Sequence, residues 1–79
     1  MIYKFYSPTC GPCKVLERNL QKTNLEYQSI DITDDANEEL IEKYNIQSIP
    51  VLLKVDENGI ELHRSKGVLA PDLLNEYFG

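Results

Sequence analysis

Two thiols at close spacing are the residues of this 79-residue chain most able to do chemistry. Cys10 and Cys13 are its only cysteines, and they lie three positions apart in the stretch SPTCGPCKVL, with Gly11 and Pro12 between them. Such a pair can form a structural disulfide, supply half of a metal site, or act as a reversible redox couple. Each use makes a different demand on the rest of the sequence.

A structural disulfide fits the sequence poorly. The N-terminal stretch MIYKFYSPTC lacks the apolar core of a signal peptide, and no segment approaches the ~20 apolar residues needed to cross a membrane. We therefore expect a cytoplasmic chain without a membrane span. Structural disulfides are rare in that reducing compartment, and one that closes so short a loop restrains the unfolded chain little.

A metal site would need more ligands than the two thiols. His63 is the only histidine, and it lies far along the chain, where we expect it to face solvent from a strand. Two thiolates do not complete a tetrahedral zinc site, although a dimer could bring four together for zinc or an iron–sulfur cluster. We predict no bound metal, which leaves a redox couple as the main interpretation of the pair.

Composition predicts one folded, acidic domain. Hydrophobic residues make up 42% of the chain, and 13 acidic residues against 8 basic ones give a net charge of -5. A chain of this length is near the lower limit for a single apolar core, so we expect one domain over residues 1–79. Because no basic cluster stands out, nucleic acid is not an expected partner. We interpret the acidic stretch DDANEE (34–39) as a capped, solvated helix start.

The apolar pattern predicts an α/β fold with the element order β-α-β-α-β-β-α. Strands are expected at 2–6, 25–32, 49–55 and 60–64, and the last two form a hairpin with Asn58-Gly59 as its turn. Helices are expected at 11–23, 36–45 and 71–78. A right-handed crossover places the second strand parallel beside the first, with the hairpin antiparallel on the other side. The result is a mixed four-stranded sheet flanked by helices.

This arrangement places the cysteine pair on the turn from the first strand to the first helix. Three residues are almost one helical turn, so both thiols meet at the helix start. Cys10 is expected at or just before the first turn, where unpaired N–H groups and the helix dipole stabilise a thiolate. Cys13, one turn inside, should be less exposed and better suited to resolve than to attack. Pro12 lacks an N–H where none is needed and stiffens the turn.

The motif Cys10-Gly11-Pro12-Cys13-Lys14 resembles the active site of the thioredoxin family. The stretch KYNIQSIPVLL (43–53) is similar to the family's segment around its cis-proline, and KGVLAPDLLNEYF (66–78) is similar to its C-terminal glycine loop and last helix. The similarity covers essentially the whole chain. Thioredoxins normally begin with an extra strand and helix, whereas this chain starts at the core strand, as glutaredoxins do.

The resemblance implies a thiol–disulfide oxidoreductase that reduces protein disulfides. In this scheme Cys10 attacks the substrate and Cys13 resolves the mixed disulfide, without a permanently bound cofactor. The resemblance also implies a cis peptide bond before Pro50 and a shallow substrate groove. The expected groove residues are Thr9, Gly11, Pro12, Ile49, Pro50 and Gly67. Expected partners are protein disulfides, with ribonucleotide reductase as a candidate, and a separate reductase as electron donor to a monomer.

Three positions depart from the family's usual residues. Thr9 and Tyr6 stand where tryptophans are usual, and Lys4 takes the place of the buried aspartate that assists proton transfer at the second cysteine. Lys4 shares one face of a central strand with Ile2 and Tyr6, where burial of its charge would be costly. Either its stem extends along apolar surface to solvent, or its cation lies near Cys13 and modifies the ionisation of that thiol.

Two alternative functions stay open. The first is a glutaredoxin recycled by glutathione, although that family usually carries paired glycines followed by acidic residues, and Gly67 is followed here by Val68-Leu69-Ala70. The second is a non-catalytic module whose cysteine pair senses redox state or binds a metal. The sequence leaves the electron donor and the physiological substrate undetermined.

Overall fold

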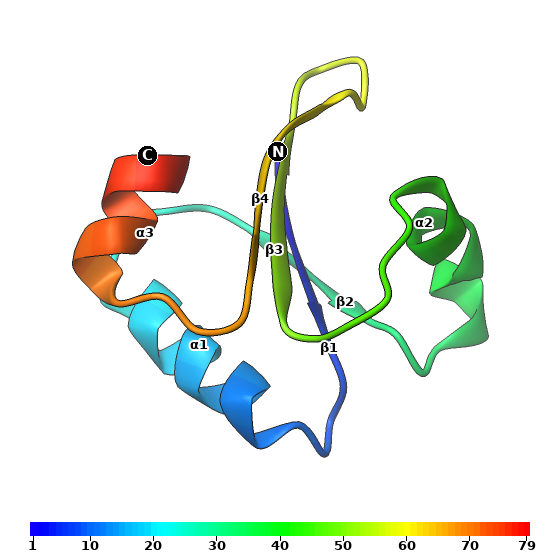
Figure 1. The fold of residues 1–79 in the computed structure, drawn as a ribbon, viewed down its shortest axis with the longest axis horizontal. Coiled ribbons are helices and arrows are strands. Elements are labelled where there is room, and N and C mark those ends of the chain that lie inside the picture. Colours follow the sequence, from blue (N-terminus) through cyan, green and yellow to red (C-terminus); the bar gives the residue numbers. More distant parts are fainter.

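A computed structural model describes all of residues 1–79 as a mixed sheet with helices on both faces (Figure 1). The strands are β1 (Ile2–Tyr6), β2 (Gln28–Asp31), β3 (Val51–Val55) and β4 (Glu61–Lys66). The helices are α1 (Gly11–Gln21), α2 (Glu38–Lys43) and α3 (Pro71–Phe78), and a short 3-10 turn, η1 (Asp35–Asn37), precedes α2. The predicted element order is confirmed. None of the helices has the length and apolar character needed to span a bilayer.

The four strands lie in the order β2-β1-β3-β4. Strand β1 runs parallel to β2 and antiparallel to β3, and β4 pairs antiparallel with β3. This is the topology expected from a right-handed crossover between the first two strands. It makes β1 and β3 the central strands, so both of their faces are covered.

The core consists of two apolar layers, one on each face of the sheet. Helices α1 and α3 cover one layer and α2 covers the other (Figure 1). The first layer contains Ile2, Leu16, Leu20, Leu52, Leu74 and Phe78. The second contains Phe5, Ile30, Tyr44, Val51, Leu53 and Val55. Side chains alternate along β1, so Lys4 points to the same face as Ile2, the face under α1.

The predicted second strand and first helix are both longer than the observed ones. Strand β2 pairs only with β1, and its first paired residue, Gln28, lies opposite Tyr3, so residues 25–27 lie outside the sheet pairing. Helix α1 ends at Gln21, two residues before the predicted end. The hydroxyl of Thr23 donates a hydrogen bond of 2.6 Å to the Leu20 carbonyl and so closes the last turn.

The predicted helix over 36–45 is divided in the structure. The carboxylate of Asp34 accepts the N–H of Ala36 at 3.0 Å and caps η1, and α2 begins only at Glu38. Helix α2 ends at Lys43 because Asn45 adopts a φ of 51°, which a right-handed helix cannot contain. The cap agrees with the interpretation of the acidic stretch as a helix start.

The hairpin forms at the predicted turn, but its strands have different limits. The carboxylate of Asp56 accepts the N–H groups of Asn58 at 2.8 Å and Ile60 at 2.9 Å, and Gly59 has a φ of 79°. Strand β4 continues past the predicted end to Lys66, which pairs with Val51. The hairpin therefore extends to the edge of the sheet at which β1 ends.

Candidate active site

The cysteine pair lies at the carboxyl end of β1, where the chain turns into α1 (Figure 1). The N–H of Cys10 donates to the Ser7 carbonyl at 3.2 Å, and Cys10 is the N-cap residue of α1. Cys10 and Cys13 form a disulfide with their Cα atoms 5.2 Å apart. The strand end and the helix start together hold the two sulfurs at one place.

The two cysteines have different surroundings. Cys10 is partly exposed, and its Sγ accepts the N–H of Cys13 at 3.1 Å, whereas Cys13 is only 2% exposed. No acidic residue lies in the first turn of α1. A thiolate on Cys10 would thus meet a backbone donor and the positive end of the helix dipole, with no nearby carboxylate on that turn.

The expected groove residues lie along the same edge of the sheet. Because Phe5 pairs with Val51 and Val51 pairs with Lys66, the residues just beyond them, Pro50 and Gly67, lie at the end of β1. The N–H of Gly67 donates to the Pro50 carbonyl at 2.9 Å. The φ of Gly67 is 86°, a left-handed conformation that glycine adopts without a Cβ penalty.

These groove residues differ in exposure. Thr9, Gly11 and Pro12 are exposed on the cysteine turn, Ile49 and Gly67 are partly exposed, and Pro50 is buried. The peptide bond between Ile49 and Pro50 is cis. The structure therefore brings all the sequence-predicted groove residues to the edge that carries the cysteines.

Lys4 is buried, with 4% of the residue exposed. Its Nζ forms an ion pair with Oε2 of Glu17 on α1 and lies 4.8 Å from the centre of the Tyr6 ring. The interpretation that the stem of Lys4 extends to solvent is therefore wrong. The Glu17 carboxylate reaches in and compensates the ammonium charge, which a buried lysine requires.

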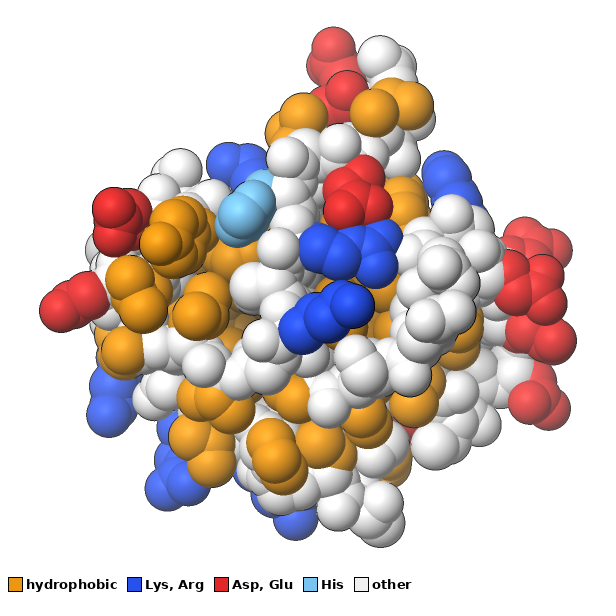
Figure 2. Space-filling view, in the orientation of Figure 1, with side chains coloured by type: hydrophobic (Ala, Val, Ile, Leu, Met, Phe, Trp, Pro, Cys, Tyr) orange, Lys and Arg blue, Asp and Glu red, His pale blue; other side chains and the backbone are white.

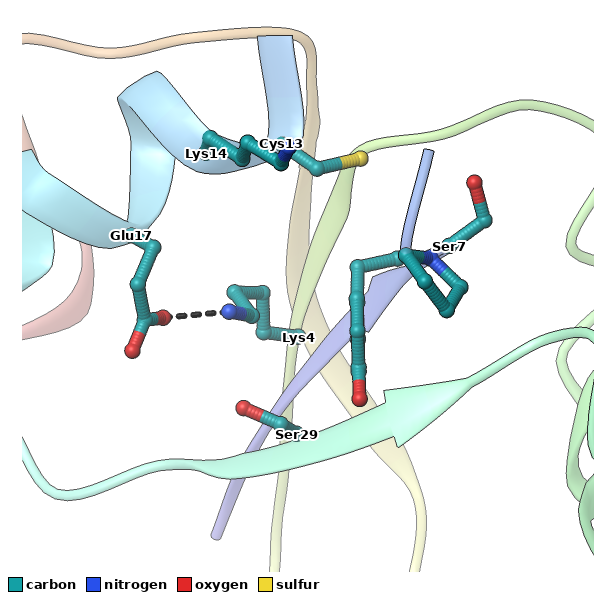
Figure 3. A pocket seen from close by; sticks show the side chains of 8 residues that line it. Lys4, Ser7, Cys13, Lys14, Glu17 and Ser29 are labelled. Carbon is teal, nitrogen blue, oxygen red and sulfur yellow. Dashed lines mark hydrogen bonds and ion pairs between the residues drawn. The ribbon is translucent and has the colours of Figure 1, made fainter. Parts of the chain in front are cut away.

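A cavity of about 330 Å³ joins this ion pair to the buried cysteine (Figure 3). Its walls are formed by Lys4, Tyr6, Ser7, Pro8, Cys13, Lys14, Glu17 and Ser29. Figure 3 shows Cys13 and Glu17 projecting from α1, with the amine of Lys4 directed from β1 toward the Glu17 carboxylate. Lys4 and Cys13 thus line one cavity, and an effect of the Lys4 cation on the ionisation of Cys13 stays a prediction.

Glu17 and Tyr27 are two site residues that sequence reasoning missed. The hydroxyl of Tyr27 donates to Oε1 of Glu17 at 2.9 Å. Burial by itself would raise the pKa of Glu17, but the hydrogen bonds from Lys4 and Tyr27 outweigh it and hold that pKa below its ordinary value. The available signal was spacing, since Glu17 follows Cys13 by four residues and must share its helix face.

The ionisation of Tyr27 provides a test of this network. Burial and the hydrogen bond to Glu17 raise the pKa of Tyr27 to about 12. We expect Glu17→Gln to lower the pKa of Tyr27 toward its ordinary ~10, because the neighbouring negative charge is removed. NMR titration of the tyrosine ring carbons would measure this, and a Tyr27 midpoint that stays near 12 in the variant would contradict the assignment.

The free energy of unfolding at alkaline pH should also depend on the ionisation of Tyr27. The folded state favours neutral Tyr27, so the contribution of this group is complete below its unfolded pKa of 10 and is lost as the pH rises toward about 12. The alkaline loss of stability should be smaller in Glu17→Gln than in the unmodified protein.

Potential metal ligands are dispersed. His63 is exposed on β4 and packs against Tyr77 and Phe78, with ring centres 5.6 and 5.1 Å apart. Nowhere do three or more His, Cys, Asp or Glu side chains come together as a metal-binding group. His63 is therefore an exposed strand residue, as expected, and its ring contacts α3, which was not predicted.

Acidic side chains gather away from the cysteines, over α2 and the turn before it (Figure 2, right). They belong to Asp34, Asp35, Glu38, Glu39 and Glu42, all of which are exposed. Acidic side chains near the start of a helix interact favourably with the positive end of the helix dipole. This surface therefore has a structural explanation.

Comparisons with known proteins agree with this architecture. The Thioredoxin family model matches residues 1–78. Thioredoxin of Bacillus subtilis is 37% identical over 76 residues, which cover 91% of this chain and 72% of the relative. A thioredoxin-like protein derived from the SPbeta prophage of the same species is 28% identical over 75 residues, covering 95% and 90%.

A solved structure gives the same result at the level of the fold. The N21Q mutant thioredoxin from Halobacterium salinarum superposes with a TM-score of 0.78 at 26% identity, covering 95% of this chain and 67% of that chain. Members of this family are thiol–disulfide oxidoreductases, and the cysteine pair found here at disulfide distance is consistent with that chemistry. The fold, the paired cysteines and the match along almost the whole chain establish that this protein belongs to the thioredoxin family.

Proposed function

We propose that this protein reduces protein disulfides by dithiol exchange between Cys10 and Cys13. The observation that carries the proposal is the difference between the two thiols at the helix start. Cys10 is partly exposed and its sulfur accepts a backbone N–H, whereas Cys13 is buried one turn inside. This favours Cys10 as the attacking thiolate and Cys13 as the resolving thiol.

The reaction is balanced in two exchanges. The Cys10 thiolate attacks one sulfur of the substrate disulfide, forms a mixed disulfide and releases the other substrate sulfur as a thiolate, which takes a proton. Cys13 then loses its proton and attacks the Cys10 sulfur. The second substrate sulfur leaves as a thiolate and is protonated, and the Cys10–Cys13 disulfide remains. Two electrons have passed to the substrate, and a separate reductase must return them.

Substrate docking is assigned to the groove residues around the cysteines, Thr9, Gly11, Pro12, Ile49, Pro50 and Gly67. The backbone of Ile49, a partly exposed residue, can pair with an extended substrate segment in the manner of an added strand. Ribonucleotide reductase is a candidate among such substrates. We further propose that the chain acts as a single-domain cytoplasmic monomer. It needs no bound cofactor, since the two thiols alone supply the chemistry.

A single-turnover assay tests this function without knowledge of the natural electron donor. Protein reduced with dithiothreitol and then desalted is mixed with insulin, and free thiols on both proteins are counted by mass spectrometry after alkylation. We expect each molecule to lose two thiols, on Cys10 and Cys13, as insulin gains two. An absence of thiol transfer would contradict the proposal.

Steady-state assays then compare the electron donors. NADPH with a thioredoxin reductase, a ferredoxin-linked reductase, and glutathione with its reductase are supplied separately. We expect insulin reduction with one of the first two donors, because the family match is to thioredoxins. Reduction supported by glutathione alone would instead favour the glutaredoxin-like function.

A further inference from the structure

The buried thiol shares its cavity with a pair of opposite charges. Titratable side chains reach the cavity from two elements: Lys4 and Tyr6 come from β1, and Lys14 and Glu17 come from α1 beside Cys13. Strand β2 contributes only the hydroxyl of Ser29. Of the titratable side chains that line this cavity with Cys13, two form an ion pair with each other.

The two charges are held in place from opposite sides of the cavity. Lys4 lies on the central strand β1, paired with Ser29 of β2 and Leu52 of β3, so its stem has no path to solvent along the sheet. Glu17 is fixed by Lys4 and by the Tyr27 hydroxyl at 2.9 Å. Because Glu17 follows Cys13 by four residues, the two residues lie one turn apart on the same face of α1, and both line the cavity.

We propose that Lys4 and Glu17 are positioning residues that set the ionisation of Cys13 in the reduced protein, Lys4 favouring the thiolate and Glu17 opposing it. This inference rests on the proposed function, in which Cys13 must ionise to resolve the mixed disulfide. Neither side chain takes the proton permanently, since the departing substrate thiolate accepts one in the balanced exchange. The pair acts through its fixed charges.

Opposite charges predict opposite effects when they are removed singly. Lys4→Met leaves the Glu17 carboxylate near the thiol, so a Cys13 thiolate becomes less favourable. Glu17→Gln leaves the ammonium unopposed, so the thiolate becomes more favourable. When both charges are removed, the two effects should largely cancel. A purely structural role for the pair predicts no such change of sign.

The test uses Cys10→Ser as the reference, because Cys13 is then the only thiol to titrate. Thiolate absorbance near 240 nm and the rate of alkylation are followed against pH. We expect Lys4→Met in this reference to raise the Cys13 midpoint by about one pH unit, and Glu17→Gln to lower it by about as much. The double variant should lie near the reference, and Lys4→Arg, which keeps the charge, should restore most of the shift.

Matched controls remove the same charges outside the cavity. Lys22→Met lies at the far end of α1 and Glu39→Gln lies on α2, and both side chains are exposed. Neither control should move the Cys13 midpoint. Midpoints of Lys4→Met and Glu17→Gln that both coincide with the reference, or that shift in the same direction, would overturn the proposal.

The experiment distinguishes a failure to fold from a shift of the Cys13 midpoint, and it tests the tuning of Cys13 separately from the proposed function. Circular dichroism identifies any variant that does not fold. If Glu17→Gln does not fold, Lys4→Met alone tests the proposal. A Cys13 midpoint that does not rise in Lys4→Met then rejects it. The titration needs no substrate, so opposite shifts without insulin reduction by the native protein would contradict the proposed function and support the tuning of Cys13. Insulin reduction by the native protein, together with Cys13 midpoints that coincide in all variants, would support the proposed function and contradict the tuning of Cys13.

Discussion

Replacement of Cys13 by Ser is expected to trap a mixed disulfide between Cys10 and the substrate, whereas Cys10→Ser is expected to form none. The first variant keeps the partly exposed residue Cys10 at the N-cap of α1 and loses the thiol that would release the substrate. The second keeps only a thiol that is 2% exposed. Both variants should reduce insulin at the uncatalysed rate under turnover conditions, because each exchange needs its own thiol.

The mixed disulfide is measured by mass spectrometry under non-reducing conditions, with insulin as the defined substrate. Partial alkylation of the reduced native protein provides an independent measurement. With limiting iodoacetamide at neutral pH, we expect label on Cys10 before Cys13, since the thiolate is the reactive form and the helix start favours it on Cys10. Labelling of Cys13 first, or trapping by Cys10→Ser, would reverse the assigned roles.

The topology could be predicted because each element carries its own local signal. Apolar and aromatic residues over 2–6 identify the central strand, and Asn58-Gly59 marks the hairpin turn without reference to the rest of the chain. The right-handed crossover rule then leaves one arrangement for these strands, and the observed sheet order is that one.

The limits of the elements could not be predicted with the same accuracy, because they depend on partners. Strand β2 begins where its pairing with β1 begins, at Gln28 opposite Tyr3. Helix α2 is short because the Asp34 cap first produces a 3-10 turn and Asn45 then takes a positive φ. The periodicity of apolar residues contains neither the register of a neighbouring strand nor the geometry of a single cap.

Part of the candidate site could likewise be predicted from the sequence and part could not. The cysteines were found from their spacing, and the groove from the family resemblance. The counter-ion of Lys4 was not found, since Glu17 lies 13 residues away on a different element and stands beside Arg18 in a stretch that resembles a solvated helix face. Only the packing of α1 onto β1 brings the carboxylate to the ammonium. Charge pairs between elements are therefore the part of this site that needed three-dimensional information.

The same pair predicts an asymmetry in stability. Glu17→Gln leaves the ammonium of Lys4 without its counter-ion at a position that is 4% exposed, and we expect a loss of about 3 kcal/mol in the free energy of unfolding. Lys4→Met leaves a carboxylate whose side chain is 33% exposed and can regain water, so its cost should stay below about 1 kcal/mol. Replacing both partners removes both charges, and it should cost less than Glu17→Gln alone.

Urea denaturation of the oxidised variants at neutral pH measures these differences. The pair of Glu61 and Arg64, 2.7 Å apart with side chains 40% and 23% exposed, is the control, and Glu61→Gln should cost less than about 1 kcal/mol. The pKa of Glu17 is held below its ordinary value, so the contribution of its charge is present above the unfolded pKa and is lost as the pH falls through the folded one. The difference between native protein and Glu17→Gln should therefore shrink in acid. If Lys4→Met lowers the free energy of unfolding as much as Glu17→Gln does, the prediction that the buried ammonium depends more on the ion pair than the carboxylate does is wrong.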